Sequence, residues 1–241
     1  MSGLLRTPAL WAAVPGLIID GGYASHMVAP QRCFYRAPDE LPAAHAAVLH
    51  CTFGTAYRGL KRAGVTTGDH VVVTGANGGV GTAAIQIATR LGARVTAVVR
   101  DASHADMLAA LGAARVLVDA GDRFHKQLAA APADVTIDCV GPPTFNASLR
   151  SLRPGGRLVV VGNVVQDKAA LNLGYVVTRG LQIIGSSGAT RADMAELIDL
   201  HRAAPFALVA DDIVDLADAD RAQRRVRAGG LRGRIVLLPR P

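Results

Sequence analysis

The chain has 241 residues, of which 50% are hydrophobic and 19% are charged, so it is long enough to bury a core and too apolar for extended disorder. Its formal net charge of +7 comes almost wholly from arginine, and aromatic residues reach only 4%. Nucleic-acid binding would favour basic stripes with stacking aromatics, whereas most of these arginines are scattered, so we expect no nucleic-acid partner. The one local run has a helical spacing that suits a solvated face as well as an anion site: Arg221, Arg224, Arg225 and Arg227.

Cysteine usage and hydropathy predict a soluble, cytoplasmic protein. The cysteines are odd in number and form no Cys-x-x-Cys pair, which argues against a disulfide framework and a four-cysteine zinc lobe: Cys33, Cys51 and Cys139. The apolar start, residues 4–19, is interrupted by Pro8 and Pro15. It therefore fits neither a signal peptide nor a membrane span, and no membrane partner is expected.

From residue 70 onward, short β-branched runs alternate with amphipathic helical patterns. This alternation predicts an α/β fold, in which a doubly wound parallel sheet carries helices on both faces. The predicted strands cover residues 70–74, 94–99, 115–118, 135–140, 157–161 and 181–184. Near-continuous apolar runs in these segments indicate burial on both faces of the sheet.

The connections and flanks are less regular than the strands. Helical periodicity predicts helices over 84–91, 105–111 and 193–201. The Pro154-Gly155 pair predicts a tight turn before the fifth strand. The first 50 residues are weakly patterned, and residues 190–241 predict only the last of those helices and a closing strand over 234–238.

A glycine-rich turn joins the first buried strand directly to a helix. In that position, glycines permit positive φ and close backbone approach, so a pyrophosphate can sit against free amides at the helix N-terminus. This arrangement predicts a Rossmann-type dinucleotide site and a sheet with the strand order 3-2-1-4-5-6. The expected cofactor-binding residues of the loop are Gly75, Asn77, Gly78, Gly79, Val80 and Gly81.

The end of the second strand indicates which dinucleotide is bound. A site selective for NADH places a carboxylate there for the ribose 2′-hydroxyl, but this strand ends in Arg100. Its planar, permanently charged guanidinium suits a 2′-phosphate, so we predict NADPH as cofactor. Asp101 follows directly and leaves NADH possible.

Several segments resemble the medium-chain dehydrogenase/reductase superfamily, specifically its zinc-type alcohol dehydrogenase and quinone or enoyl reductase branches. They are residues 21–28, which read Gly-Gly-Tyr-Ala-Ser-His-Met-Val, and residues 51–64, 74–81, 138–141 and 233–237. The resemblance covers almost the whole chain. It implies that the closing strand returns to a substrate domain and that the sixth strand pairs across a homodimer.

The resemblance also implies a division of the chain. Residues 1–50 would be the residual part of a barrel-like substrate domain, residues 51–189 the Rossmann domain, and residues 190–241 a segment that returns to the substrate domain. The leading part of that substrate domain, which family members have before the Gly21 segment, is not in the sequence, so the chain looks like a truncated member.

The rival short-chain dehydrogenase family has a similar glycine fingerprint, and Tyr57-x-x-x-Lys61 mimics its catalytic pair. The order of the motifs argues against it. In that family the loop lies near the chain start and the Tyr/Lys pair follows, whereas here the pair precedes the loop.

The resemblance assigns further site residues. Cys51 matches the last zinc-binding cysteine of the alcohol dehydrogenases, but one ligand cannot hold zinc tightly, so the zinc site is incomplete. We therefore expect Cys51 to be a buried structural cysteine, with zinc binding as the alternative. Residues expected around the nicotinamide and pyrophosphate are Thr55, Val140, Gly141, Gly162 and Arg234, each of which also has a purely structural interpretation.

The leading functional hypothesis is an NADPH-dependent oxidoreductase of the zinc-type alcohol dehydrogenase group, which transfers hydride between the cofactor and an alcohol, aldehyde or related carbonyl substrate. Two alternatives stay open. One is a zinc-free quinone or enoyl reductase, and the other is a catalytically inactive cofactor-binding remnant or a subunit that a separate chain completes. The sequence identifies neither the substrate nor the proton donor.

Overall fold

The computed structural model describes residues 20–34, 36–120, 123–165 and 167–239. The apolar start at residues 4–19, and with it the expectation that it is neither a leader nor a span, lies outside these ranges. Within them, we find no helix with the length and hydropathy that a membrane span requires.

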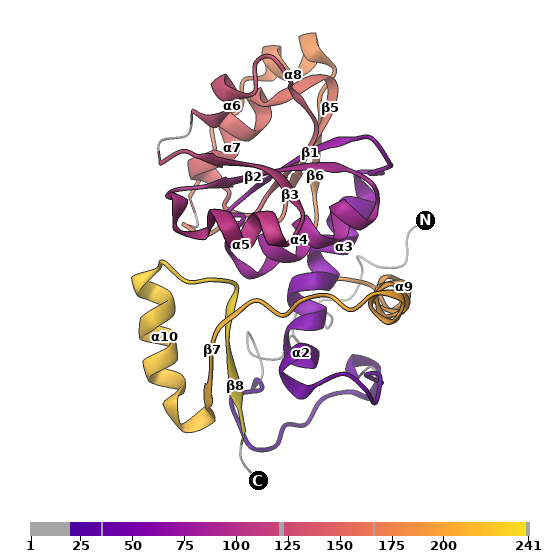
Figure 1. Cartoon of the computed structure of the whole chain (residues 1–241), viewed down its shortest axis with the longest axis vertical. Helices are drawn as coiled ribbons and strands as arrows, with labels where there is room; N and C mark the ends of the chain where they lie inside the picture. Colours follow the sequence, from indigo (N-terminus) through magenta and orange to yellow (C-terminus); the bar gives the residue numbers. More distant parts are fainter. Residues whose placement is uncertain (1–19, 35, 121–122, 166, 240–241) are drawn as a thin grey trace.

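The centre of the molecule is a parallel sheet with helices on both faces (Figure 1). Its strand order is β3-β2-β1-β4-β5-β6, and every neighbouring pair is parallel. The predicted fold class and strand order are therefore confirmed. The strands are β1 (His70–Thr74), β2 (Arg94–Val99), β3 (Ala113–Val118), β4 (Ala133–Asp138), β5 (Leu152–Val160) and β6 (Gln182–Gly185).

Each face of the sheet packs into its own hydrophobic cluster. On one face, Val71 and Val73 of β1 pack with the helices α3 (Thr55–Arg62), α4 (Gly79–Arg90) and α5 (Ala105–Ala110). On the other face, Val72 packs with α6 (Phe124–Gln127), α7 (Pro142–Arg150) and α8 (Leu173–Arg179). All five residues of β1 are buried, as the apolar run predicts for a central parallel strand.

The turn predicted at Pro154-Gly155 is instead an irregularity inside β5. The strand begins at Leu152, and the pairing register with β4 shifts from Ala133–Leu152 to Val135–Arg157. Gly155, whose φ is 74°, lies in the extra residues of β5. The Pro-Gly pair thus makes a bulge, which tolerates the missing proline N–H and the positive φ.

The flanking segments lie together below the sheet in Figure 1 and carry more structure than the sequence predicts. The leading flank contains η1 (Gln31–Cys33), α2 (Ala43–Val48) and η2 (Leu49–Gly54). Outside the flanks, a short 3₁₀ turn, η3 (Ala102–His104), follows β2. The trailing flank contains α9 (Arg191–Ala203), β7 (Ala210–Asp215), η4 (Leu216–Asp218), α10 (Ala219–Ala228) and β8 (Arg234–Leu238). The predicted helix and closing strand are α9 and β8.

The sequence analysis missed β7 and α10, and their composition explains why. β7 reads Ala-Asp-Asp-Ile-Val-Asp, and aspartate is depleted in strands. α10 buries only Ala222, so it has almost no apolar periodicity. Tertiary contacts hold both, because β7 pairs in parallel with β8 and Arg225 of α10 forms ion pairs with Asp211 and Asp212 of β7.

Candidate functional site

The glycine-rich turn between β1 and α4 has the geometry of a phosphate loop. Gly75 adopts φ 58°, and a Cβ atom at Gly81 would collide with the backbone of Gly75 and Ala76, so the loop needs glycine at both ends. α4 begins at Gly79, and its first amides have no intrahelical acceptors. They are available to an anion at the positive end of the helix dipole.

A cavity of about 430 Å³ opens beside this loop, at the edge of the sheet where the parallel strands end. Five of the predicted cofactor-binding residues line it: Gly75, Asn77, Gly78, Arg100 and Val140. The sequence analysis missed the others, which are Thr74, Val98, Val99, Asp119, Ala120, Cys139, Pro143, Thr144, Val164 and Val165. Most of them directly follow or end a strand, so the rule that ligands bind at the carboxyl ends of parallel strands would have found them.

The wall of the cavity includes one thiol, that of Cys139, and lies next to a buried carboxylate. Cys139 follows β4 and lines the cavity, and burial raises the pKa of its thiol, which disfavours the reactive thiolate form. Nearby, the fully buried carboxylate of Asp138 accepts hydrogen bonds from the amides of Val140 and Gly141 and from the hydroxyls of Thr144 and Ser148. Asp138 therefore shapes the cavity wall as a structural cap.

Arg100 and Asp101, which give opposite indications of cofactor preference, differ in what they contact. Arg100 is exposed and lines the cavity at the end of β2. The carboxylate of Asp101 caps η3 by accepting a hydrogen bond from the Ser103 amide at 2.9 Å, and hydrogen bonds from Ser103 lower its pKa. Asp101 is absent from the residues that line the cavity.

The trailing segment reaches back onto the phosphate loop. A parallel bridge joins Gly78 and Gly233, and the Gly233 amide donates to the Asn77 carbonyl at 2.7 Å. The Arg234 side chain lies so close to Gly79 that a Cβ atom there would collide with it. The structure thus brings Arg234 next to the first turn of α4, although the two are some 150 residues apart in the sequence.

The residues expected beside the nicotinamide lie at element ends. Thr55 is buried at the start of α3, and the methyl group of Thr52, one turn earlier, lies against Gly79. Gly141 is the N-cap of α7, and Gly162 packs against the Cys139 carbonyl so tightly that no Cβ atom fits. Val140 lines the cavity, whereas Thr55, Gly141 and Gly162 do not, and the nicotinamide role of all four residues stays a prediction.

Cys51 is exposed, which contradicts the expected buried structural role. It lies in η2, a π-helical segment. Among the described residues, no group of three or more His, Cys, Asp and Glu side chains could hold a metal ion. The described residues therefore do not fit a zinc site.

The Tyr57 and Lys61 pair, which resembles a short-chain dehydrogenase motif, belongs to an ion-pair network between α3 and α9. The Tyr57 hydroxyl donates to Glu196, and the Lys61 ammonium lies 2.6 Å from Glu196 and 3.3 Å from Asp193. Burial and the Glu196 carboxylate raise the pKa of Tyr57 to about 12. A catalytic tyrosine needs a lowered pKa, so this pair has a structural role.

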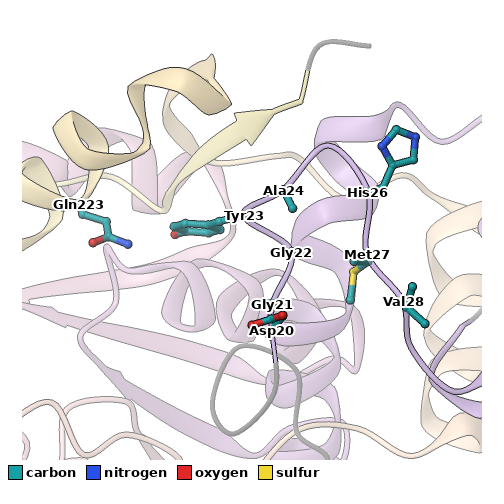
Figure 2. A pocket seen from close by; sticks show the side chains of 9 residues that line it. All are labelled: Asp20, Gly21, Gly22, Tyr23, Ala24, His26, Met27, Val28 and Gln223. Atoms are coloured by element: carbon teal, nitrogen blue, oxygen red, sulfur yellow. The ribbon is translucent and has the colours of Figure 1, made fainter.

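A second hollow, of about 960 Å³, lies between the segment from Asp20 to Val28 and α10. Figure 2 shows the Tyr23 ring turned towards Gln223, whereas His26 points away from both. The hollow shares no lining residue with the cavity beside the phosphate loop. Its side chains converge on no point, so we place the candidate cofactor site at the phosphate loop.

The strand order, the glycine-rich loop at a helix N-terminus and the cavity at the carboxyl edge together define a Rossmann domain of the dinucleotide-dependent oxidoreductase class. Residues 79–203 match the zinc-binding dehydrogenase family. This chain belongs to that family, and with it to the medium-chain dehydrogenase/reductase superfamily, as the sequence motifs predict.

Known proteins of this family resemble the chain in sequence and structure. Acryloyl-coenzyme A reductase of Metallosphaera sedula is 34% identical over 91% of this chain and 65% of its own length. The solved structure of AibC is 38% identical, with a TM-score of 0.86 over 93% of this chain and 64% of its own. A thermostable alcohol dehydrogenase from Pyrobaculum aerophilum is 29% identical, with a TM-score of 0.87 over 96% of this chain. The chain thus spans about two thirds of the length of these relatives.

Proposed function

We propose that this chain is the cofactor-binding part of an NADPH-dependent oxidoreductase. The observation that carries the proposal is the cavity of about 430 Å³ at the carboxyl edge of the sheet, which combines a glycine-rich helix N-terminus with Arg100 at the end of β2. A pyrophosphate needs the first feature and a 2′-phosphate the second. The Asp101 carboxylate caps η3 and does not line the cavity, so Arg100 is the charged side chain at the end of β2 that faces it.

The residues fit the cofactor in a definite order along the cavity. Gly75 and the residues from Gly78 to Gly81, together with Arg234, would hold the pyrophosphate, and Arg100 would hold the 2′-phosphate. Asp119 and Ala120, after β3, border the cavity on the same side as Arg100 and suit the adenine end. Thr55, Val140, Gly141 and Gly162 would border the nicotinamide.

The substrate class that we favour is an α,β-unsaturated thioester. Acryloyl-coenzyme A reductase is the relative that supports this choice over the alcohols and aldehydes that the sequence motifs favour. When bound, NADPH supplies a hydride for the β-carbon, and solvent supplies the proton for the α-carbon. The part of this chain is to orient the cofactor and to exclude water from its reactive face.

The second candidate is the oxidation of alcohols or reduction of aldehydes, as in the alcohol dehydrogenase from Pyrobaculum aerophilum. It is favoured by the match to the zinc-binding dehydrogenase family and by Cys51, at the position of a zinc-ligating cysteine. Against this candidate, the described residues do not form a zinc site.

The division of the chain and its assembly are proposals of the same kind. We propose residues 51–189 as the Rossmann domain, with residues 1–50 and 190–241 as parts of a substrate domain. β6 lies at the edge of the sheet, where Ile183 is 39% exposed, and this edge is available to the same strand of a second copy in a homodimer. The cytoplasmic location also stays a prediction.

Titration calorimetry with NADPH and NADH, followed by turnover assays, tests the proposal. We expect NADPH to bind more tightly than NADH, and crotonyl-coenzyme A or acryloyl-coenzyme A to be reduced at the C=C bond. Turnover of aldehydes that depends on added zinc would favour the second candidate. NADPH binding without any turnover would identify the chain as a cofactor-binding remnant or as a subunit that needs a partner, and absence of binding would refute the proposal.

A further inference from the structure

The trailing segment from Leu231 to Arg234 lies against the phosphate loop, where the side chain of Asn77 donates a hydrogen bond to the Leu231 carbonyl. We infer that Asn77 is a positioning residue, whose amide fixes this segment so that Arg234 faces the pyrophosphate. This inference rests on the proposed function, because it concerns how the same site binds its cofactor.

Asn77 contacts the segment through both its side chain and its backbone. Its Nδ2 donates to the Leu231 carbonyl at 3.0 Å, and its own carbonyl accepts from the Gly233 amide at 2.7 Å. The next residue, Gly78, forms the bridge with Gly233. Because the two contacts of Asn77 straddle Arg232, they fix both the position and the direction of the segment.

The backbone of the segment is built for this close approach. Gly233 has φ 63°, and a Cβ atom there would collide with the Val209 carbonyl. Behind it, the Arg232 amide donates to the Asp211 carboxylate at 3.3 Å, and Asp211 is only 9% exposed. The segment is therefore held on one side by Asp211 and on the other by Asn77.

The position of this segment determines where the side chain of Arg234, the first residue of β8, lies. Its side chain lies against Gly79, at the first turn of α4, where an anion would bind. The Arg234 side chain is long and exposed, so it has many accessible rotamers. Whether it faces the anion therefore depends on how firmly the preceding residues are fixed. Without the Asn77 side chain, cofactor binding would have to order the segment as well, and affinity would fall.

Asn77 also lines the cavity, so a direct contact with the cofactor is the competing interpretation. The two differ in how the effects of substitutions combine. If Asn77 acts through Arg234, its substitution has no further effect once Arg234 is removed. If Asn77 binds the cofactor directly, the two losses multiply.

A double-mutant cycle on the full chain tests the inference, with NADPH affinity measured by calorimetry for wild type, Asn77→Ala, Arg234→Ala and the double variant. We expect a loss of about 5-fold for Asn77→Ala and about 30-fold for Arg234→Ala, from one neutral and one charge-assisted interaction. The double variant should bind within about 2-fold of Arg234→Ala. Asn146→Ala, on the exposed side of α7, is the matched control and should bind like wild type.

Hydrogen exchange of the cofactor-free protein supplies a readout independent of NADPH. In Asn77→Ala, or in the milder Asn77→Ser if alanine prevents folding, the backbone amides of residues 231–236 should exchange faster than in wild type. The exchange rates in β1 should be unchanged. Multiplying losses, about 150-fold in the double variant, or unchanged exchange would overturn the inference. Failure of the wild type to bind NADPH, together with faster exchange in Asn77→Ala, would overturn the proposed function. It would still support the role of Asn77 in fixing the trailing segment.

Discussion

Replacement of Arg100 by alanine is the sharpest perturbation of the proposed cofactor preference. The 2′-phosphate is the only group that distinguishes NADPH from NADH, and Arg100 is the cationic side chain at the end of β2 that lines the cavity. A hydrogen bond to a charged group contributes about 1.5–3 kcal/mol. Because Arg100 is exposed, we take the lower end, about 1.5 kcal/mol, which corresponds to a loss of about 12-fold in NADPH affinity.

The assay is calorimetric titration of wild type and Arg100→Ala with NADPH and NADH at two salt concentrations. NADH affinity should stay within about 2-fold, and higher salt should reduce the wild-type preference, since exposed charges are screened. Arg94→Ala is the matched control, because Arg94 is an exposed arginine at the opposite end of the same strand and its loss changes the net charge equally. Equal weakening of both cofactors, or weakening by Arg94→Ala of the same size, would refute the assignment.

Three other substitutions test the structural roles of site residues. Asp138→Ala should lower the free energy of unfolding by about 3 kcal/mol in urea denaturation, because it leaves buried amide and hydroxyl donors without an acceptor; a change below about 1 kcal/mol would contradict the capping role. Tyr57→Phe should leave NADPH binding unchanged and remove the latest step of tyrosinate formation in an alkaline titration, at about pH 12. Since the folded pKa is raised, the Tyr57 contribution to stability is present below pH ~10 and disappears towards the folded pKa, so the variant should lose less stability over that window; equal losses would refute this. Cys51→Ser should leave the melting temperature unchanged because the side chain is exposed, and its zinc content, measured beside wild type, should also be unchanged; loss of a stoichiometric zinc would show that Cys51 is a ligand.

The sheet was predictable because its signals are local. Buried parallel strands read as apolar runs, and the glycine-rich turn marks where the first of them gives way to a helix. The predicted bounds of β1 and β2 are confirmed, whereas at least one end of each other strand differs from its prediction. The Pro154-Gly155 pair predicts a turn but forms a bulge, because a sequence pattern does not show which neighbour a strand pairs with. β7 and α10 were missed for the opposite reason, since pairing and ion pairs stabilise them and apolar periodicity does not.

The candidate site was predictable where one motif supplies several residues in sequence. Gly75, Asn77 and Gly78 line the cavity as expected. The remaining wall comes from the ends of other strands and from the loop after β5, such as Asp119 and Val164. Each of these residues is unremarkable in its own segment, and only the strand order brings them to the same edge.

The hydrogen bond between Asn77 and Leu231 is a contact that sequence patterns do not predict. The two residues are 154 positions apart, and neither a glycine-rich loop nor a trailing segment indicates the other as a partner. The contact depends on β7 pairing with β8, which directs the chain back towards the loop at Gly233. Resemblance pointed to Arg234, but its position at the first turn of α4 follows from that pairing together with Asn77. A cofactor site of this kind is therefore sensitive to changes in the trailing sheet, far from any residue that would contact the dinucleotide.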